Sequence, residues 1–435
     1  MKWLCAPLAV LLACVVALCQ PVSARDVVEI ESPTGIKAWL VADPGVPIVA
    51  IGFAFVGGSA QDPPDRTGLA TVLAAMLDQG AGEADAATFE ARLGEVGSRL
   101  SFSASQLAIG GGLLSLKRHL PVSAALLRDS LVAPRFAPDR LVRVQSQLSA
   151  ELAADATHPA TAAHAAFAQE AFAGHPFARP VKGDAAGIAA VTTGELARHH
   201  RRLVARDSLR LVLVGDLAPD EARALIDTIF AALPAASDRA AIATVAPSPF
   251  EKRLPGLPGQ VFETAVFALP APALGHEGFF AALAVNHITG SGNLDARLTR
   301  ALRVERGLTY AVASALVATP QSSYILGSLS TRPGKMDEAV AALKETLAEI
   351  AREGIGEAEL SRATSGLIGS YLVQHDTSAA LAAHLLALAV DGLPPDYAER
   401  RRLVLSRLDA AVASRAARVL LDPDKLSILV LGAAP

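Results

Sequence analysis

The chain has 435 residues, of which 51% are hydrophobic and 19% charged, a composition that supports sizeable cores and excludes a disordered polypeptide. Its length predicts two or more domains, because a single domain usually holds roughly 100–200 residues. The 39 lysines and arginines nearly balance 43 aspartates and glutamates, and no basic run is long enough to follow a phosphate backbone, so nucleic acid is not an expected partner.

The first predicted element is an N-terminal targeting segment. Lys2 precedes an apolar run over Trp3–Leu18, and Val22–Ala24 supplies the small residues of a cleavage site. We therefore expect residues 1–24 to be a cleaved signal peptide and the mature protein to be periplasmic or secreted. An uncleaved anchor is the alternative, but the run is shorter than the roughly 20 residues that a spanning helix needs, and no later stretch of that length lacks charges. No stable membrane span is expected.

All three cysteines, Cys5, Cys14 and Cys19, lie inside this segment. Cleavage after Ala24 would leave a mature chain without cysteine, which excludes disulfides, thiolate zinc sites and a cysteine nucleophile. Lipid modification of Cys19 is a further alternative, although Leu18 is larger than the residue that such processing prefers.

Several short apolar runs of the first half predict strands. The runs Gly35–Val41 and Ile48–Val56 flank a turn signal at Asp43–Gly45, a pattern typical of a β-hairpin. Ser101–Ser105 alternates with apolar residues and is interpreted as an edge strand. Gly110–Gly112 lies between apolar runs and lacks a following Lys-Ser/Thr pair, so it is not a phosphate loop.

The same arrangement of predicted elements occurs twice along the chain. Ser208–Asp216 and Asp424–Gly432 are both apolar strands that end at a glycine, and each follows a helical stretch, Thr193–Val204 and Ser406–Leu420 respectively. A repeat of this length indicates a duplicated domain, since solenoid repeats hold only about 20–50 residues.

We predict an N-terminal domain over residues 25–235, a proline-rich linker over residues 236–260 and a C-terminal domain over residues 261–435. Helical patterns such as Met336–Arg352 and Glu357–Val373 alternate with short strands. The expected fold class is α+β, with two duplicated domains that each form a largely antiparallel sheet with helices packed on one face.

The predicted helix Gly68–Leu77 places its leucines, valine and methionine on one stripe. Thr71, Ala74 and Ala75 lie on the other side, at the spacing at which two histidines and a glutamate would bind and activate zinc. A methyl group has no lone pair and a lone hydroxyl is a poor zinc ligand, so these positions cannot hold the metal. None of the ten histidines pairs with another at i, i+4.

A second motif lies in the C-terminal half. The residues Leu302–Tyr310 predict an amphipathic helix that ends near Gly307, followed by a strand over Tyr310–Val317. The Arg303 guanidinium at the helix end and the Tyr310 phenol at the strand entry could therefore converge on one spot. Upstream of this helix, Gly290-x-Gly292 is interpreted as a simple turn, and the alternative is a loop that binds an anion or lines a peptide groove.

These two motifs resemble those of the pitrilysin or insulinase-type metallopeptidases. Their zinc helix carries H-x-x-E-H within Gly-Leu-Ala-His-x-x-Glu-His-Met, and Thr71, Ala74 and Ala75 stand at the three catalytic positions. Their C-terminal motif, Leu-Arg-x-x-x-Gly-Leu-x-Tyr, matches here with Arg303 and Tyr310. The third zinc ligand, a glutamate, falls near Glu151, which is either a remnant or a surface residue.

The resemblance implies a clam-like non-catalytic subunit of a heteromeric zinc peptidase. This chain would hold no metal, a related H-x-x-E-H subunit would supply the zinc, and Arg303 and Tyr310 would bind the substrate peptide near its scissile carbonyl. In the family, the strand equivalent to Ser101–Ser105 takes up extended substrate by β-augmentation. The alternative is a catalytically inert peptide-binding or scaffold protein of the same fold. An enzyme with another site is disfavoured because no nucleophile–base arrangement is visible.

Overall fold

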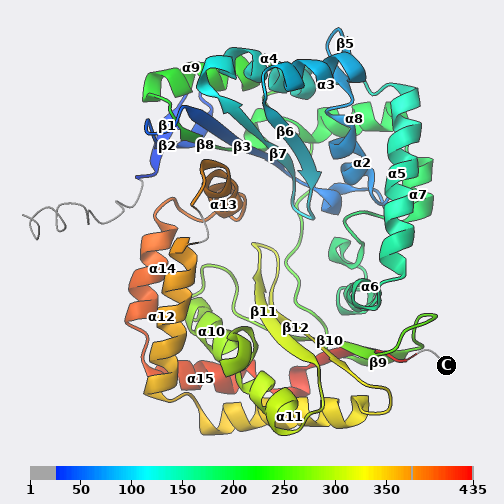
Figure 1. Ribbon diagram of the computed structural model, residues 1–435, viewed down its shortest axis with the longest axis vertical. Coiled ribbons are helices and arrows are strands. Elements are labelled where there is room, and N and C mark those ends of the chain that lie inside the picture. Colours follow the sequence, from blue (N-terminus) through cyan, green and yellow to red (C-terminus); the bar gives the residue numbers. More distant parts are fainter. Residues whose placement is uncertain (1–25, 374–375, 434–435) are drawn as a thin grey trace, which may run out of the picture.

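Two β-sheets, one from each half of the chain, form the framework of the structure, a computed structural model that describes residues 26–373 and 376–433 (Figure 1). The predicted signal peptide and Cys19 lie outside the described residues. The N-terminal sheet has the order β1 (Val28–Glu31), β2 (Lys37–Ala42), β8 (Leu209–Gly215), β3 (Ile48–Val56), β7 (Ala108–Leu116) and β6 (Arg99–Ala104). The C-terminal sheet has the order β11 (Ala311–Ala318), β12 (Ser323–Thr331), β10 (Glu263–Pro270), β13 (Ser427–Leu431) and β9 (Glu251–Leu254).

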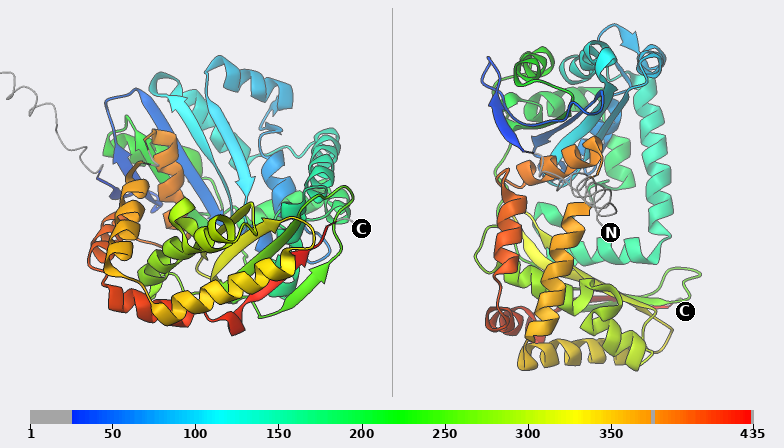
Figure 2. Two further views of the ribbon diagram at one scale, coloured as in Figure 1. Left: turned by 60° about the horizontal axis from the view of Figure 1, so that its bottom comes forward. Right: turned by 60° about the vertical axis from the view of Figure 1, so that its left-hand side comes forward.

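Helices pack on both faces of the sheets (Figure 1 and Figure 2). Those of the first half are α2 (Leu69–Met76), α3 (Ala86–Glu95), α4 (Leu120–Val132), α5 (Pro138–Ala156), α6 (Pro159–Ala171), α7 (Ala185–Ala190), α8 (Thr193–Leu203) and α9 (Pro219–Phe230). Those of the second half are α10 (Phe279–Asn286), α11 (Met336–Glu353), α12 (Glu357–Val373), α13 (Ser378–Val390), α14 (Tyr397–Ser406) and α15 (Ala410–Leu420). Most strand pairs are antiparallel, which confirms the predicted α+β class. A small hairpin of β4 (Gly80–Ala81) and β5 (Ala84–Asp85) belongs to neither of these two sheets.

The predicted hairpin of the first two apolar runs is wrong. The strands β2 and β3 do not pair, because the buried strand β8 lies between them, parallel to β2 and antiparallel to β3. A turn signal reports only local chain reversal and carries no information on a strand that inserts from far along the sequence. Gly215 ends β8 in a backbone conformation with φ of 136°, where a Cβ would lie 2.1 Å from the Ile48 carbonyl oxygen.

The two halves exchange one helix each across their inner faces. Helix α13 belongs to the second half by sequence but packs on β3 and β8 of the N-terminal sheet, where Ala382, Leu385 and Leu388 join a cluster with Val212 and Val214 (Figure 1). Helix α6 of the first half packs in turn on β10 and β13 of the C-terminal sheet. Each half therefore completes the core of the other.

One strand falls inside the predicted linker. The segment Glu251–Leu254 forms β9, which pairs in parallel with β13 at the edge of the C-terminal sheet. The part of the predicted linker before it holds no helix or strand and lies against both halves, as shown by the hydrogen bonds of the Gln61 side chain to Ala240 and of the Val245 amide to the Gln321 carbonyl.

His200, on α8, makes the stability of the fold pH-dependent. Its side chain is buried, with Nε2 at 2.9 Å from the Leu131 carbonyl oxygen, and burial lowers the pKa of His200 to about 4. The folded state therefore binds this proton less readily than the unfolded chain, so its contribution to stability is complete above pH 6.5 and is lost as the pH falls toward 4.

We expect this loss to reach about 3 kcal/mol. The measurement is the free energy of unfolding by urea between pH 7.5 and 4 for the wild type and for His200→Gln, which keeps a hydrogen-bond donor for Leu131. Other titrating groups are common to both proteins, so the difference between the two curves isolates His200. Parallel curves would show that His200 is not the source.

Candidate functional site

The helix α2 is fixed at its first turn by a buried aspartate. The Asp62 carboxylate accepts hydrogen bonds from the backbone amides of Gly68 at 3.1 Å and Ala70 at 3.0 Å. The His199 Nε2 atom lies 3.4 Å from Asp62 Oδ1, and both side chains are almost fully buried. Burial raises the pKa of Asp62, against the lowering effect of His199 and the two amides. The helix that would carry a zinc motif is therefore rigidly placed.

The three motif positions on α2 have other contacts. The Thr71 hydroxyl donates to the Val181 carbonyl oxygen at 2.7 Å. Ala74 is 2% exposed within the core cluster of the helix, whereas Ala75 is partly exposed. In the described residues, no group of three or more His, Cys, Asp or Glu side chains could hold a metal ion. The residues at these positions do not fit zinc, because they offer one engaged hydroxyl and two methyl groups.

Glu151 faces a lysine. It lies on α5, where its carboxylate accepts a hydrogen bond from the Gln147 amide at 3.2 Å. The Lys182 ammonium lies 3.8 Å from Glu151 and 2.8 Å from Asp155, and the hydrogen bond to Asp155 raises the pKa of Lys182. Lys182 follows Val181, whose carbonyl oxygen accepts from Thr71, so its ammonium lies between the degenerate motif and the carboxylates of Glu151 and Asp155.

Arg303 lies beside the free edge of the C-terminal sheet. It belongs to the π-helical segment Thr299–Glu305, is exposed, and lines a cavity of about 410 Å³ along the edge strand β11. Gly290 lines the same cavity, in a second π-helical segment, His287–Ser291, so the predicted simple turn is wrong here. A Cβ at Gly290 would lie 2.2 Å from the Ser314 hydroxyl, which explains the glycine as a site of close approach to β11.

Tyr310 directly precedes β11. Its amide donates to the Ser330 carbonyl at 3.1 Å, and its ring contacts Phe262 edge-on with the centroids 5.0 Å apart, while 59% of the residue stays exposed. Arg303 therefore lies beside the first residues of β11, and Tyr310 directly precedes this strand; that the two side chains converge on one spot stays a prediction. Within the described part of the chain, neither side chain has an ion pair or a side-chain hydrogen bond, so both are available to a ligand.

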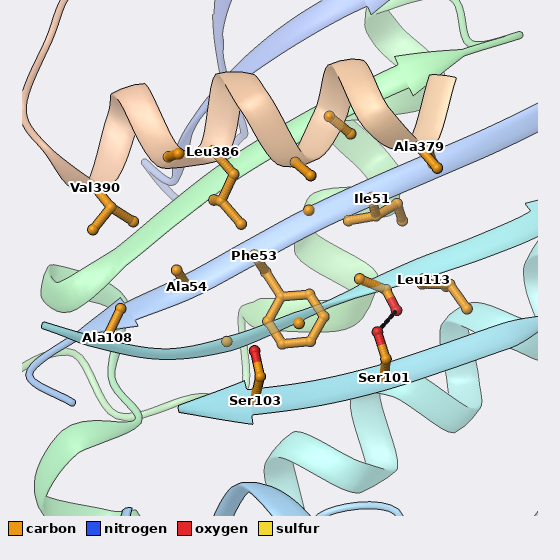
Figure 3. A pocket seen from close by; sticks show the side chains of 18 of the residues that line it. Ile51, Phe53, Ala54, Ser101, Ser103, Ala108, Leu113, Ala379, Leu386 and Val390 are labelled. Atoms are coloured by element: carbon orange, nitrogen blue, oxygen red, sulfur yellow. Dashed lines mark hydrogen bonds between the residues drawn. The ribbon is translucent and has the colours of Figure 1, made fainter. Parts of the chain in front are cut away.

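A larger groove lies on the inner face of the N-terminal sheet. It holds about 610 Å³ between α13 and the strands β3, β7 and β6 (Figure 3). The predicted edge strand is present as β6, at one end of the strand order. Sequence reasoning missed the groove, although Gly110–Gly112 was a signal for it: these residues form part of its floor.

Profiles of known families match most of the chain. The family described as Insulinase (Peptidase family M16) matches residues 37–185, and the Peptidase M16 inactive domain matches residues 190–367. The non-peptidase homolog YmxG of Helicobacter pylori is 25% identical over 334 residues, which cover 76% of this chain and 77% of the relative. An uncharacterized zinc protease of Mycobacterium bovis is 27% identical over 59% of each chain.

Solved structures share the fold. A peptidase M16 inactive domain from Pseudomonas fluorescens superposes with a TM-score of 0.87 at 24% identity, covering 94% of this chain and 99% of that one. The periplasmic protease PqqL of Escherichia coli gives a TM-score of 0.79 at 16% identity, and the match covers 94% of this chain but 46% of PqqL. Among the helices of the described residues, none is both long and apolar enough to cross a bilayer.

Proposed function

Because this chain belongs to the insulinase family, peptidase family M16, we propose that it is the non-catalytic subunit of a heteromeric periplasmic zinc peptidase. The observation that carries the proposal is an asymmetry within one chain. The zinc helix is present, but Thr71, Ala74 and Ala75 cannot hold a metal, whereas Arg303 and Tyr310 are exposed beside the edge strand β11.

The two groups suit one step of peptide hydrolysis. A zinc ion in a partner subunit would supply the activated water. As water attacks the peptide carbonyl, negative charge develops on its oxygen, and donors already aimed at that oxygen stabilise the transition state. Arg303 and Tyr310 would donate to it from this subunit. Glu151 is given no role in this scheme, since a single carboxylate without histidine partners makes no zinc site.

One prediction from the sequence and one structural similarity support the cellular setting. The predicted signal peptide would direct the chain out of the cytoplasm, and one structural neighbour, PqqL, is a periplasmic protease. We place the boundary between the two duplicated domains within residues 236–260, after the last helix of the first half and before β10.

The proposal is tested by co-expressing this chain with an H-x-x-E-H homologue from the same genome. The two proteins should purify together, and an unfolded peptide should be cleaved by the mixture and not by this chain alone. A homologue that cleaves equally well without this chain would contradict the proposal. A stable complex that cleaves no peptide would favour an inert scaffold instead.

A further inference from the structure

A cavity at the β1–β2 end of the N-terminal sheet is lined by three cations. It holds about 380 Å³ between the turn that joins β1 to β2 and the start of β8, three strands that lie side by side in Figure 1. Lys37 begins β2, Arg210 lies on β8, and Arg206 belongs to the short 3₁₀ turn before β8. Ligand pockets usually hold roughly 300–1,000 Å³, so this cationic cavity has room for a small molecule.

Two of the cations stand next to each other. The parallel register pairs Trp39 with Val212, so Lys37 and Arg210, each two residues earlier, occupy one face on neighbouring strands. Like charges at such positions destabilise a sheet. Burial, with Arg239 nearby, lowers the pKa of Arg210. An anion bound between the two cations would offset their repulsion.

The third cation, Arg206, lacks a partner for its side chain. It is only partly exposed, and its buried Nε atom meets no hydrogen-bond acceptor in the part of the chain that the structure describes. Other partly buried arginines of this protein have a carboxylate, as Arg66 has Glu195 at 2.8 Å and Arg297 has Glu359 at 2.5 Å. An unpaired buried donor is costly, so the unsatisfied guanidinium of Arg206 indicates that a ligand supplies the missing acceptor.

Two carboxylates lie near the cationic cavity and do not neutralise it. Asp207 lines the cavity, but its oxygens accept hydrogen bonds from the Ser237 amide at 2.8 Å and the Ser237 hydroxyl at 2.9 Å. Glu31 stands opposite Lys37 in the register of β1 and β2, yet among the described residues Lys37 forms no ion pair. Three cations against two carboxylates leave a positive charge for a bound anion.

We propose that the cationic cavity binds the phosphate group of a phosphorylated small molecule or of a lipid headgroup. Lys37, Arg206 and Arg210 reach it from separate segments, which suits a tetrahedral group with several acceptor oxygens better than a planar carboxylate or a chloride ion. The inference goes beyond the proposed function, because the cavity lies on the N-terminal sheet and shares no residue with the cavity beside Arg303.

The first test measures binding of inorganic phosphate to the purified full chain by calorimetry at pH 7.5. The ionic strength is held constant because salt screens the cations. Phosphate should bind saturably and raise the unfolding midpoint, whereas acetate should do neither. Lys37→Gln and Arg210→Gln should each weaken binding roughly 10–100-fold, the loss of a charge-assisted hydrogen bond.

Arg92→Gln is the matched control. Arg92 is exposed on α3, does not line the cationic cavity, and carries the same charge, so its loss should leave phosphate binding unchanged. Because Lys37 is also exposed, Lys37→Gln should unfold at the midpoint of the wild type without phosphate, and the test does not depend on the folding of Arg210→Gln.

The second test identifies the source of the phosphate with vesicles of phosphatidylglycerol and phosphatidylcholine. Co-sedimentation that Lys37→Gln abolishes would assign the cavity to a lipid headgroup. Binding of phosphate without co-sedimentation would assign it to a soluble phosphorylated molecule. Absence of saturable binding in both tests, or equal binding by the wild type and Lys37→Gln, would overturn the inference, as would an equal loss in Lys37→Gln and Arg92→Gln. None of these outcomes bears on whether Arg303 acts in hydrolysis by the complex.

Discussion

Replacing Arg303 by alanine should lower peptide hydrolysis by the complex with an H-x-x-E-H subunit about 10²–10³-fold, the usual cost of losing one preorganised donor to a developing oxyanion. The loss should appear in kcat, because the interaction strengthens as charge develops on the carbonyl oxygen. Arg303 is exposed and lines the cavity along β11, so removing its side chain leaves no cavity in a core. The measurement is kcat and KM on a fluorogenic peptide, together with the unfolding midpoint of the variant.

Arg306→Ala is the matched control. Arg306 lies one helical turn further along the chain and forms an ion pair with Glu345 at 2.6 Å on the surface. Such pairs contribute only about 0–1 kcal/mol, so this variant should hydrolyse peptide at the wild-type rate. Tyr310→Phe, which keeps the ring against Phe262 and removes only the hydroxyl, should lower kcat in the same direction as Arg303→Ala. Equal rates for Arg303→Ala and Arg306→Ala would show that Arg303 has no part in the reaction.

Restoring the three motif side chains should not restore a zinc site. In Thr71→His/Ala74→Glu/Ala75→His, the new carboxylate at position 74 would be enclosed in the core around α2, where Ala74 is 2% exposed. An uncompensated buried charge costs about 3–5 kcal/mol. We expect the single change Ala74→Glu to lower the free energy of unfolding by this amount, measured by urea denaturation at pH 7.

The pH dependence of this loss in the free energy of unfolding shows whether the buried carboxylate causes it. Burial would raise the pKa of the new carboxyl above its unfolded value, so the deficit should be full at neutral pH and shrink as the pH falls toward about 4. Ala75→Glu is the control on the same helix, because Ala75 is partly exposed, and it should cost less than about 1 kcal/mol. Stoichiometric zinc in the triple variant would contradict the account of this helix.

Local patterns predicted individual elements well. The helix α2 falls within the predicted Gly68–Leu77, α11 and α12 begin where their periodicity begins, and β11 is shifted by one residue from its prediction. Gly307 ends its helix with φ of 60°. These features follow from hydrophobic period and backbone conformation over a few residues, which the sequence displays directly.

Long-range placement could not be predicted in the same way. Nothing near Asp43–Gly45 indicates that β8 separates β2 from β3. The exchange of α6 and α13 between the halves likewise depends on surfaces that meet only in the folded chain. One signal was available: α13 is apolar on nearly all sides, which is typical of a helix covered by more than its own domain.

The features of the candidate site that depend only on residue type could be predicted from the sequence. The loss of zinc ligands at Thr71, Ala74 and Ala75 is visible in the sequence, and so is the spacing of Arg303 and Tyr310. The contacts that these positions and Glu151 make instead could be seen only in the structure. Examples are the hydrogen bond from the Thr71 hydroxyl to Val181 and the approach of Lys182 to Glu151. The groove under α13 could likewise be found only in the structure. It forms between a helix from the other half and a sheet that carries several glycines at this place.

We infer that this chain provides a peptidase-family fold whose own residues hold no metal centre. The most direct test of this inference is the zinc content of the purified chain, measured by mass spectrometry after dialysis against a zinc buffer, alongside hydrolysis of an unfolded peptide by the same sample. We expect substoichiometric zinc and no cleavage in the absence of a partner. One zinc ion per chain with cleavage that a chelator abolishes would contradict the inference.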